Sequence, residues 1–541
     1  MESHPAVAEP LARLSPDQRA AATARPGPVL CVAPAGSGKT TTLVARVAWL
    51  VGGGVDPATI AAITFNRRAA EELEARLAEA LAPLDVAPDG IRVRTFHALG
   101  LEVLRDASRP TGPITDRMTI LRQVAPDAGP AGWGALDTAI SKVKVDLGVT
   151  AAEVAGDAQA GPVARTFVAY ERALAAAGSL DFDDLIIGAL RALESDTALL
   201  ARWRGRCAHL LVDEVQDVDR LQLRLALLLA APANRIFLVG DDDQSIYGWR
   251  LADVRRIFAL AARLPELERH HLITNFRCPG PVVERSIRLV ARNRERFAKT
   301  VRAGPGSSGR LILAPDAGDD DERIGRAFDA WPANESSRAV LARTNAELVP
   351  AAVIALDRGI PFRARGVRLP LDDPWLDSAI AAILTSSEAE SGVPLPVVIG
   401  RLRAGSMTAG AGDAGIGAAY EALLGWAPRF ADAAALAVGV REQRERLGRL
   451  RRDDAKLTLA TAHAVKGLEF DHVIVLQDAD RFPSRRALDE AADPARALEE
   501  ERRLAYVAWT RARRSLTLLY DPAAPSQFLL EAFDRSELGL R

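Results

Sequence analysis

Residues 28–40 read PVLCVAPAGSGKT, a short apolar run followed by a glycine-rich turn and a Lys-Thr pair. The run is typical of a buried parallel strand, and the pattern after it is helical. Gly36 and Gly38 allow the backbone to turn tightly, so that its N–H groups can face phosphate oxygens. This order of strand, turn and helix predicts a phosphate-binding loop in an α/β domain, although Ala33 stands where the strict GxxxxGK[ST] pattern has glycine.

The polar side chains near this loop favour a nucleoside triphosphate with a magnesium ion. Lys39 can neutralise charge on the β- and γ-phosphates, and Thr40 can bind Mg²⁺. The segment VDEVQD at 212–217 ends another apolar run, where carboxylates emerge beside a phosphate loop. Asp213 would hold Mg²⁺, usually through water, and Glu214 would orient or deprotonate an attacking water. We therefore predict ATP and Mg²⁺ as cofactors. The loop residues expected to contact the nucleotide are Ala35, Gly36, Ser37, Gly38, Lys39, Thr40 and Thr41.

Similar apolar runs, rich in Val, Ile and Leu, recur in two sets along the chain. The first set comprises residues 28–33, 59–65, 91–96, 209–214 and 234–241. The second set comprises residues 310–315, 338–344, 456–463, 472–478 and 515–520. Short runs of this kind between helical stretches are typical of buried parallel strands. They predict an α/β fold with two lobes, each built on a parallel sheet.

Two mainly helical stretches without a strong strand signal interrupt these sets, and a chain of 541 residues is too long for one ordinary core. We therefore expect four parts, in which each lobe carries a helical insertion. The expected parts are a first lobe at 1–100 and 181–275, its insertion at 101–180, a second lobe at 276–350 and 451–541, and its insertion at 351–450.

Composition narrows the class of protein. The 69 basic and 71 acidic residues give a net charge of −2, so any surface for nucleic acid must be local. No apolar run approaches the roughly 20 residues of a membrane helix, and the start, MESHPAVAEP, lacks the features of a signal peptide. The three cysteines form no CxxC pair, which argues against a zinc ribbon or a disulfide framework. We expect a cytoplasmic protein that does not contact a membrane.

Further segments resemble, in order and wording, the motifs of UvrD/Rep/PcrA-type helicases of superfamily 1. The resemblance extends from about residue 11 to about residue 520. The segments are LSPDQRAA at 14–21, ITFNRRAAEEL at 63–73, TFHALG at 95–100, DFDDL at 181–185, VGDDDQSIYGWR at 239–250, NFRCP at 275–279, TAHAVKGLEFDHVIV at 461–475 and EERRLAYVAWTRAR at 500–513. The resemblance implies two RecA-like P-loop lobes with parallel sheets, each with a mainly helical insertion.

The resemblance also implies roles around the nucleotide. Arg277 and Arg511 stand at the family's arginine-finger positions, and such cations offset the charge that builds on the γ-phosphate during hydrolysis. The other implied contacts are Gln18 at the adenine edge, Phe276 stacked on adenine in place of the usual Tyr, Gln244 at the γ-phosphate and Glu469 at the ribose. The predicted catalytic set is therefore Lys39, Asp213, Glu214, Gln244, Arg277 and Arg511.

On the nucleic-acid side, a local basic groove with aromatic platforms is sufficient to bind a single strand. Trp249 is the strongest candidate for stacking on a base, whereas Tyr247 fits base stacking and core packing equally well. The full set of DNA contacts that the resemblance implies is Thr64, Phe65, Thr95, His97, Tyr247, Trp249, Thr461 and His463.

The expected function is ATP-dependent movement on single-stranded DNA or at junctions with duplex, from 3′ to 5′, in DNA repair, recombination or replication. We expect a monomer, with repair or replication proteins as partners. We expect no nuclease domain after the last motif, because the sequence ends soon after it, at Arg541.

Departures from the family pattern and rival interpretations limit this expectation. TFNRRAA stands for the usual TFTNKAA, and DEVQD stands for DEYQD. The second insertion is shorter than in full-length relatives, which favours a translocase that removes bound proteins without processive unwinding. A noncatalytic regulatory subunit is the other rival, but it would not need the intact catalytic set. Backbone and stacking contacts do not by themselves distinguish DNA from RNA.

Overall fold

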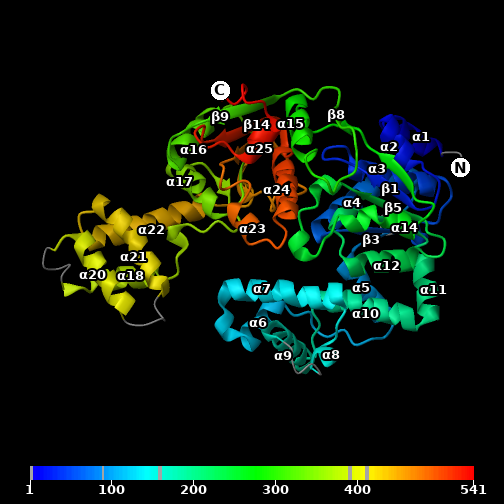
Figure 1. Cartoon of the computed structure of the whole chain (residues 1–541), viewed down its shortest axis with the longest axis horizontal. Helices are drawn as coiled ribbons and strands as arrows, with labels where there is room; N and C mark the ends of the chain where they lie inside the picture. Colours follow the sequence, from blue (N-terminus) through cyan, green and yellow to red (C-terminus); the bar gives the residue numbers. More distant parts are fainter. Residues whose placement is uncertain (1–3, 88–89, 156–160, 388–392, 409–413, 541) are drawn as a thin grey trace. The chain divides into compact units, whose positions relative to one another are not determined.

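The computed structural model describes residues 4–87, 90–155, 161–387, 393–408 and 414–540. The chain divides into two compact units. Unit 1 contains the chain up to Ser307 together with Arg502–Tyr506, and unit 2 contains Ser308–Glu501 together with the chain from Val507 onwards. Each unit is built around its own six-stranded sheet with helices packed against it, which confirms the predicted α/β fold with two lobes (Figure 1).

The six-stranded sheet of unit 1 is parallel and has the strand order β3-β2-β4-β5-β1-β6. Its strands are β1 (Val29–Val32), β2 (Ile60–Thr64), β3 (Arg92–Thr95), β4 (His209–Val212), β5 (Ile236–Gly240) and β6 (Glu268–His271). The first five coincide with the first set of apolar runs. No apolar run predicts β6, because its sequence, ERHH, lies at the sheet edge and remains partly exposed.

Helices cover both faces of this sheet, because successive strand residues point to opposite faces. Cys31 packs in one core with Leu43 of α3, whereas Val32 packs in the other with Leu223 of α12. The main helices of the lobe are α1 (Pro5–Ala12), α2 (Pro16–Ala22), α3 (Lys39–Gly52), α4 (Arg67–Leu81), α5 (Phe96–Asp106), α10 (Phe182–Ser195), α11 (Thr197–Arg206), α12 (Arg220–Ala230) and α15 (Gly280–Val290).

Between α5 and α10 the chain forms a helical insertion with a core of its own. Its helices are α6 (Arg117–Val124), α7 (Gly129–Ser141), α8 (Ala151–Ala155) and α9 (Pro162–Ala176), with a π-helical stretch at Lys142–Leu147. The core consists of Ile120, Leu121, Ile140, Phe167, Tyr170 and Leu174. Among the described residues of 101–180 no β-strand is formed, and an isolated β-bridge joins Ile114 to Leu180.

Unit 2 repeats the parallel arrangement, with the strand order β11-β12-β10-β13-β14-β9. Its strands are β9 (Arg310–Pro315), β10 (Arg338–Ala342), β11 (Phe362–Arg363), β12 (Leu457–Thr461), β13 (Phe470–Leu476) and β14 (Ala512–Tyr520). Its helices are α16 (Asp320–Asp329), α17 (Val349–Asp357), α18 (Leu376–Leu384), α20 (Leu395–Thr408), α21 (Ala414–Trp426), α22 (Ala433–Leu450), α23 (Arg485–Asp489), α24 (Pro494–Trp509) and α25 (Gln527–Ala532). One core continues from this sheet into α18, α20, α21 and α22 of the second insertion.

No single helix in the described part of the chain is both long enough and apolar enough to cross a membrane. A pair bent by 107°, Ile416–Arg429 with Ala433–Leu450, meets the length and composition criteria only when the two helices are taken together.

The boundary between the units lies later in the chain than the expected lobe boundary at residue 275. Residues 276–307 pack with unit 1 because the short strands β7 (Thr274–Asn275) and β8 (Arg302–Ala303) pair there, and because Val290 of α15 packs against Ala35. One turn of α24, Arg502–Tyr506, also packs with unit 1. Sequence pattern alone could not separate these segments from the second lobe, because the residues that they contact are distant from them in the sequence.

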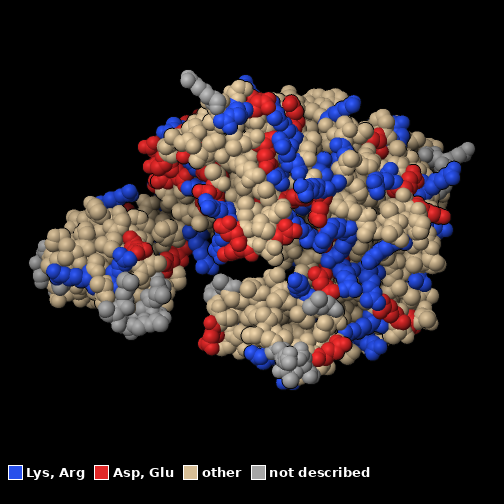
Figure 2. All heavy atoms as spheres, in the orientation of Figure 1, with Lys and Arg blue, Asp and Glu red and all other residues tan. Residues whose placement is uncertain are grey.

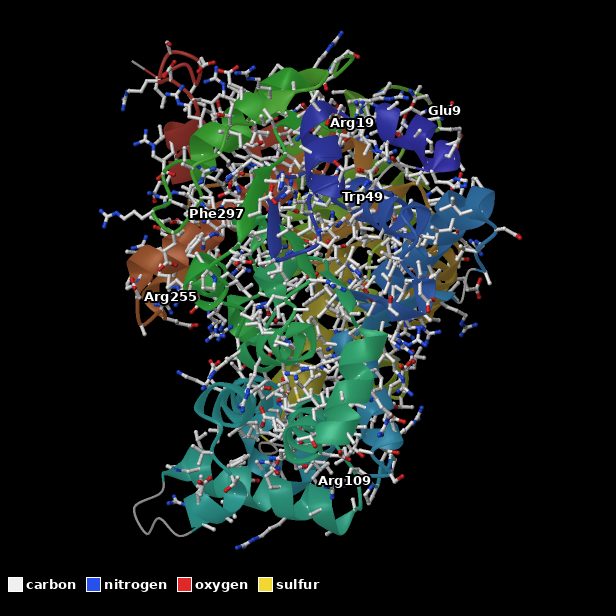
Figure 3. All side chains as sticks on the ribbon, turned by 90° about the vertical axis from the view of Figure 1, so that its right-hand side faces the viewer. Glu9, Arg19, Trp49, Arg109, Arg255 and Phe297 are labelled. Carbon is white, nitrogen blue, oxygen red and sulfur yellow. The ribbon has the colours of Figure 1, made fainter. Side chains whose placement is uncertain are left out.

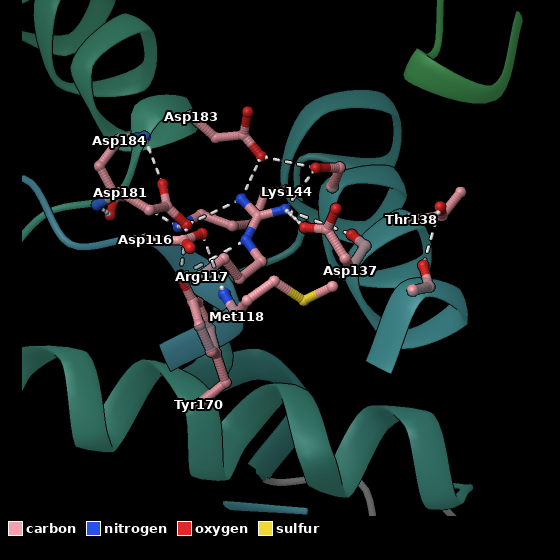
Figure 4. Close-up of polar contacts among 12 residues, drawn as sticks. Asp116, Arg117, Met118, Asp137, Thr138, Lys144, Tyr170, Asp181, Asp183 and Asp184 are labelled. Carbon is pink, nitrogen blue, oxygen red and sulfur yellow. Dashed lines mark hydrogen bonds and ion pairs between the residues drawn. The ribbon is translucent and has the colours of Figure 1, made fainter. Parts of the chain in front are cut away.

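A buried polar cluster, which we call the Asp181 cluster, links the helical insertion of unit 1 to the start of α10 (Figure 4). It consists of Arg117, Asp137, Ser141, Lys144, Tyr170, Glu171, Asp181, Asp183 and Asp184. Asp181 lies at its centre and accepts from Arg117 at 2.8 Å, from Lys144 at 2.9 Å and from the Tyr170 hydroxyl at 2.8 Å. Although burial raises it, the Lys144 and Arg117 charges lower the net pKa of the Asp181 carboxyl below its ordinary value.

The same carboxyl forms the N-cap of α10, where it accepts from the backbone N–H of Asp184 at 2.9 Å. Asp181 is 2% exposed, so its charge is compensated by protein groups rather than by water. Breaking a buried pair of this kind leaves charge without a partner, which costs more than losing a surface pair. The cluster therefore fixes where the insertion leaves the lobe.

We predict that Asp181→Asn lowers the free energy of unfolding of unit 1 by about 3 kcal/mol, because Arg117 and Lys144 lose their shared carboxylate. Asparagine is also a good N-cap, so the change isolates the charge from the cap. Asp137→Asn is the matched control: its side chain is 42% exposed and pairs with Arg117 at 3.0 Å, so we expect a loss of no more than about 1 kcal/mol. Urea unfolding followed by circular dichroism measures both, and equal losses would contradict the central role of Asp181.

Candidate nucleotide and nucleic-acid site

The loop between β1 and α3 has the backbone that a phosphate site requires. Gly36 and Gly38 adopt left-handed conformations, with φ of 70° and 81°. Gly38 is the N-cap of α3 and supplies no side-chain cap, so the first N–H groups of this helix and its positive dipole end point out of the turn. A Cβ at residue 36 would lie 2.7 Å from Asn275 Oδ1, and a Cβ at residue 38 would lie 2.5 Å from Gln18 Nε2. The positive φ favours glycine at both positions, and at residue 36 a Cβ would also clash with Arg277 Cβ at 2.8 Å.

Gln18 supports this loop from α2. Its side chain completes a capping box with Ser15, and its Nε2 donates to the Ser37 carbonyl at 2.8 Å. The Ser37 hydroxyl is itself buried and has no hydrogen-bond partner among the residues that the structure describes. Buried hydroxyls are normally hydrogen-bonded, so this one fits a polar ligand atom in the loop.

The two carboxylates predicted at the end of β4 lie beside Lys39. Lys39 Nζ is 3.4 Å from Glu214 Oε1. Glu214 has φ of 51°, a conformation that a residue other than glycine rarely adopts. Burial and the neighbouring Glu214 charge raise the pKa of Asp213 to about 7. A divalent cation would offset this concentration of negative charge, so the residues present fit a metal ion.

Gln216, which the motifs do not single out, connects these carboxylates to the next strand end. Its Nε2 donates to a Glu214 carboxylate oxygen, and its Oε1 accepts from the Asp241 backbone N–H at 2.9 Å. A Cβ at residue 240 would lie 2.3 Å from the same Oε1. The only sequence signal was its place in VDEVQD, between two acidic residues.

Residues 241–243 form a second buried cluster, which we call the aspartate–lysine cluster. It consists of Asp241, Asp242, Asp243, Arg296 and Lys299. Lys299 Nζ lies 2.7, 2.6 and 2.8 Å from the carboxylates of Asp241, Asp242 and Asp243, and all four side chains are 0% exposed. Gln244 directly follows Asp243 in the sequence, and its Nε2 donates to Asp241 Oδ2 at 2.7 Å. Sequence reasoning missed Lys299, since a single lysine in RFAKT carries no local signal.

The NFRCP segment is held against the phosphate loop. Asn275 Nδ2 donates to the Ala35 carbonyl at 2.7 Å, and the backbone N–H of Phe276 donates to the Gly36 carbonyl at 2.8 Å. Asn275 Oδ1 accepts from the backbone N–H of Arg277 at 2.9 Å. The Phe276 ring is exposed, as stacking on a ligand requires, and Arg277 follows it directly.

Tyr506 brings α24 to the same loop. The backbone N–H of Ala35 donates to the Tyr506 hydroxyl at 3.2 Å, and that hydroxyl donates to Asp241 Oδ2 at 3.4 Å. The phosphate loop, the aspartate–lysine cluster and one turn of α24 are thus joined through a single phenol, which the sequence analysis did not single out.

In unit 2, Thr461 and His463 lie at the carboxyl end of β12, whereas Glu469 and Arg511 directly precede β13 and β14. Arg511 is 1% exposed, and its guanidinium donates to the carbonyls of Val507 at 2.8 Å and Leu468 at 3.1 Å. Glu469 pairs with Arg513. Thr461 ends β12, and burial with the Arg343 and Lys466 charges lowers the pKa of His463 to about 4.

In unit 1 the aromatic candidates form a continuous row. The Phe65 and Tyr247 rings stack with their centres 5.1 Å apart and their planes inclined by 13°. The Tyr247 ring meets the Trp249 ring edge-on, with the ring centres 6.3 Å apart. Trp249 is 55% exposed, and the Arg250 guanidinium lies 5.2 Å from its ring centre. We call Phe65, Tyr247 and Trp249 the aromatic row.

A cavity of about 450 Å³ opens beside this row. Its lining includes Phe65, His97, Phe182, Trp249 and Arg250. His97 meets the exposed Phe182 ring edge-on at 5.3 Å, and burial lowers the pKa of His97, so the imidazole is neutral near pH 7. The cavity therefore offers stacking surfaces. Its lining also includes Arg117 and seven aspartates, which make it acidic rather than positive: Asp116, Asp137, Asp181, Asp183, Asp213, Asp217 and Asp219.

Two of the predicted DNA contacts have local structural roles. Thr64 is buried and donates to the Asn66 carbonyl at 3.2 Å, and Thr95 caps α5 by accepting from the Ala98 N–H at 3.2 Å. On the face shown in Figure 2, basic side chains lie among acidic ones, in keeping with the balanced composition.

Among the residues that the structure describes, no group of three or more His, Cys, Asp or Glu side chains could hold a metal ion by itself. Magnesium at phosphate sites keeps several waters and uses only one or two carboxylates together with the phosphates. The two predicted magnesium ligands, Thr40 and Asp213, would supply one hydroxyl and one carboxylate, which is consistent with that pattern.

Comparison with known proteins gives the family. The model of the UvrD/REP helicase N-terminal domain matches residues 14–265, and that of the UvrD-like helicase C-terminal domain matches residues 441–522. The chain is 30% identical over 553 residues to the ATP-dependent DNA helicase UvrD2 of Mycobacterium tuberculosis (strain ATCC 25618 / H37Rv), covering 94% of this chain and 78% of that protein. It is 27% identical over 645 residues to the ATP-dependent DNA helicase Rep of Escherichia coli (strain K12), covering 96% and 94%. It is 27% identical over 624 residues to DNA helicase II of the same strain, covering 94% of this chain and 84% of that protein. The chain therefore belongs to the UvrD/REP helicase family.

Proposed function

We propose that this chain is an ATP-dependent DNA helicase that moves from 3′ to 5′ along single-stranded DNA and acts at junctions with duplex, in repair, recombination or replication. One observation carries the proposal: a single short segment, 239–250, contributes to both the nucleotide site and the aromatic row of unit 1. Hydrogen bonds through the Tyr506 hydroxyl connect Asp241 to the phosphate loop, and Gln244 is hydrogen-bonded to Asp241. A few residues later, Trp249 presents an exposed ring beside the cavity.

Each part of the nucleotide site has a role in hydrolysis. Water attacks the γ-phosphorus while the bond to the bridging oxygen of ADP breaks, and negative charge spreads over the γ-phosphate oxygens. Glu214 orients or deprotonates that water, and Lys39 offsets the phosphate charge from the loop. Arg277 and Arg511 would supply further positive charge to the γ-phosphate oxygens.

Thr40 and Asp213 would hold Mg²⁺, which supplies Lewis-acid polarisation of the phosphate oxygens when it is bound. The raised pKa of Asp213 supports this assignment, since a buried carboxyl beside another carboxylate favours a cation as its neighbour.

Movement along the strand follows from stacking that changes with the nucleotide. Bases stack on the aromatic row without regard to sequence, because every base has a flat apolar face. His97 and Phe182 extend the same surface. On the second lobe, Thr461 and His463 would hold the strand while the aromatic row releases it, so that one cycle of ATP advances the motor.

The alternative, a translocase that removes bound proteins without processive unwinding, is favoured by one observation. The alignment with Rep extends over 645 residues, more than the 541 residues of this chain, so Rep contains segments that this chain lacks. The second insertion is the expected place of this difference.

Prediction for hydrolysis. Single-stranded DNA should stimulate ATP hydrolysis by the full chain, and Glu214→Gln should lower kcat by at least about 100-fold, because the amide can no longer act as a base. Lys39→Ala should abolish turnover by removing the phosphate cation. Glu9→Gln, at an exposed surface residue labelled in Figure 3, is the control and should keep the full rate. Duplex DNA and single-stranded RNA are measured in parallel; no stimulation by any nucleic acid would contradict the motor.

Prediction for stacking. Trp249→Ala should weaken single-stranded DNA binding by about 5- to 100-fold, since one base–aromatic stack contributes about 1–3 kcal/mol. Hydrolysis without DNA should stay within about twofold, because the Trp249 ring packs against Tyr247 and Arg250, which lie outside the phosphate loop. Trp375→Ala, at a 41% exposed tryptophan of unit 2, is the matched control. Fluorescence anisotropy with labelled oligo(dT) measures binding, and equal loss of binding and of basal hydrolysis would indicate a folding defect instead.

Prediction for direction and unwinding. Streptavidin bound to the 5′ end of an oligonucleotide should be displaced faster than streptavidin at the 3′ end, because a 3′-to-5′ motor runs towards the 5′ end. Displacement from the 3′ end alone would reverse the assigned polarity. Duplexes with a 3′ single-stranded tail, tested beside these substrates, distinguish the helicase from the alternative: streptavidin removal without strand separation would favour the translocase.

A further inference from the structure

Lys299 is the most completely buried cation near the site, and its position is unusual in two respects. It compensates three successive aspartates at once, and it comes from a segment that carries none of the predicted motifs. Neighbouring contacts close the cluster: Arg296 pairs with Asp243 at 2.9 Å, and the backbone N–H of Phe297, labelled in Figure 3, donates to Asp242 at 2.8 Å. Three carboxylates cannot remain together without water unless such cations balance them.

Asp241 is the member of this cluster that reaches the nucleotide site. Its Oδ1 accepts from Lys299, whereas its Oδ2 accepts from Gln244 Nε2. A carboxylate can only accept hydrogen bonds, so the end of the Gln244 amide that faces it must be the NH₂ end. The ionised Asp241 therefore sets which way round the Gln244 amide lies.

The charge of Lys299 is what keeps this arrangement in one state. Although burial raises it, the Lys299 and Lys39 charges lower the net pKa of Asp241 below its ordinary value. Without Lys299, protonating one of the three carboxylates relieves their repulsion at the lowest free-energy cost. A protonated Asp241 can donate, and the Gln244 amide can then turn over to present its oxygen to it.

We propose that Lys299 is a positioning residue for ATP hydrolysis: by pairing with Asp241, Asp242 and Asp243, it fixes the orientation of the Gln244 amide towards the γ-phosphate. This inference rests on the proposed ATPase function and adds a residue to it. Lys299 touches neither nucleotide nor DNA in this scheme and acts only through Asp241 and Gln244. The same pairing holds the base of the turn that leads to Tyr247 and Trp249.

The test is a double-mutant cycle on the full chain, with single-stranded DNA and saturating ATP. Lys299→Met should lower kcat by about 10- to 100-fold, the range of one misplaced catalytic contact, and should leave KM for ATP within about threefold. Gln244→Ala should lower kcat to a similar extent. Because both changes remove the same contact, the double variant should hydrolyse ATP no more slowly than Gln244→Ala alone.

A second variant and a matched control separate positioning from stability. Lys299→Arg keeps the charge but moves its donors, so it should lower kcat in the unchanged chain and have no effect in the Gln244→Ala background. Lys144→Met removes another buried lysine that pairs with three carboxylates, in the Asp181 cluster; it should lower the melting temperature without changing kcat. Lys299→Arg also carries the cycle if Lys299→Met does not fold.

The outcomes distinguish the two proposals. If the unchanged chain hydrolyses ATP and the Lys299 and Gln244 effects multiply, Lys299 does not act through Gln244 and the inference is wrong, while the proposed function stands. A raised KM with unchanged kcat would overturn it in the same way. If the unchanged chain hydrolyses no ATP with any nucleic acid, the proposed function fails and the inference fails with it.

Discussion

The geometry of the site depends on the parallel order of the strands in unit 1. In a parallel sheet all strands end at the same edge, so β2, β4, β5 and β1, which are neighbours, deliver their following residues to one place. Thr64, Asp213, Asp241 and Ala33 follow or end these four strands. Residues as far apart in the sequence as Ala33 and Asp241 thus meet at a single edge, and no local interaction could bring them together.

This constraint also explains how much of the site could be predicted from the sequence. Residues at strand ends were accessible to prediction, because the apolar run before each one identifies the strand and the parallel pattern identifies the edge. Lys39, Glu214 and Gln244 belong to this group. Gln216, Lys299 and Tyr506 could not be predicted, because tertiary contacts place each of them. Lys299 follows the last apolar run of the first lobe in the sequence. Tyr506 contacts the phosphate loop although it lies near the end of the chain. The edge strand β6 was missed for a related reason, because a strand exposed on one side does not need an apolar sequence.

Unit 1 contains two buried clusters of opposite charges, and they solve a similar problem at different places. The Asp181 cluster joins the helical insertion to α10, whereas the aspartate–lysine cluster lies under the site. A buried ion pair gains little net stability over an apolar contact of the same size, but it permits only arrangements in which every charge keeps its partner. Apolar packing would tolerate small shifts of the insertion or of residues 241–243. Charge pairing restricts both to one register, which a site built from distant segments requires.

The short distance along the chain between Asp241 and Trp249 has a consequence for how the two halves of the site communicate. The intervening residues contain one 3-10 turn at Asp242–Gln244 and a second at Gly248–Arg250, with Tyr247 stacked on Phe65 between them. Gln244 and the first turn are fixed from below by carboxylates that cannot move without separating from Lys299. The first turn therefore stays in place, and any shift of the segment is taken up further along, at Tyr247 and the exposed Trp249. A rigid base and a partly exposed end make this segment suited to carry a change at the nucleotide to the surface on which bases stack.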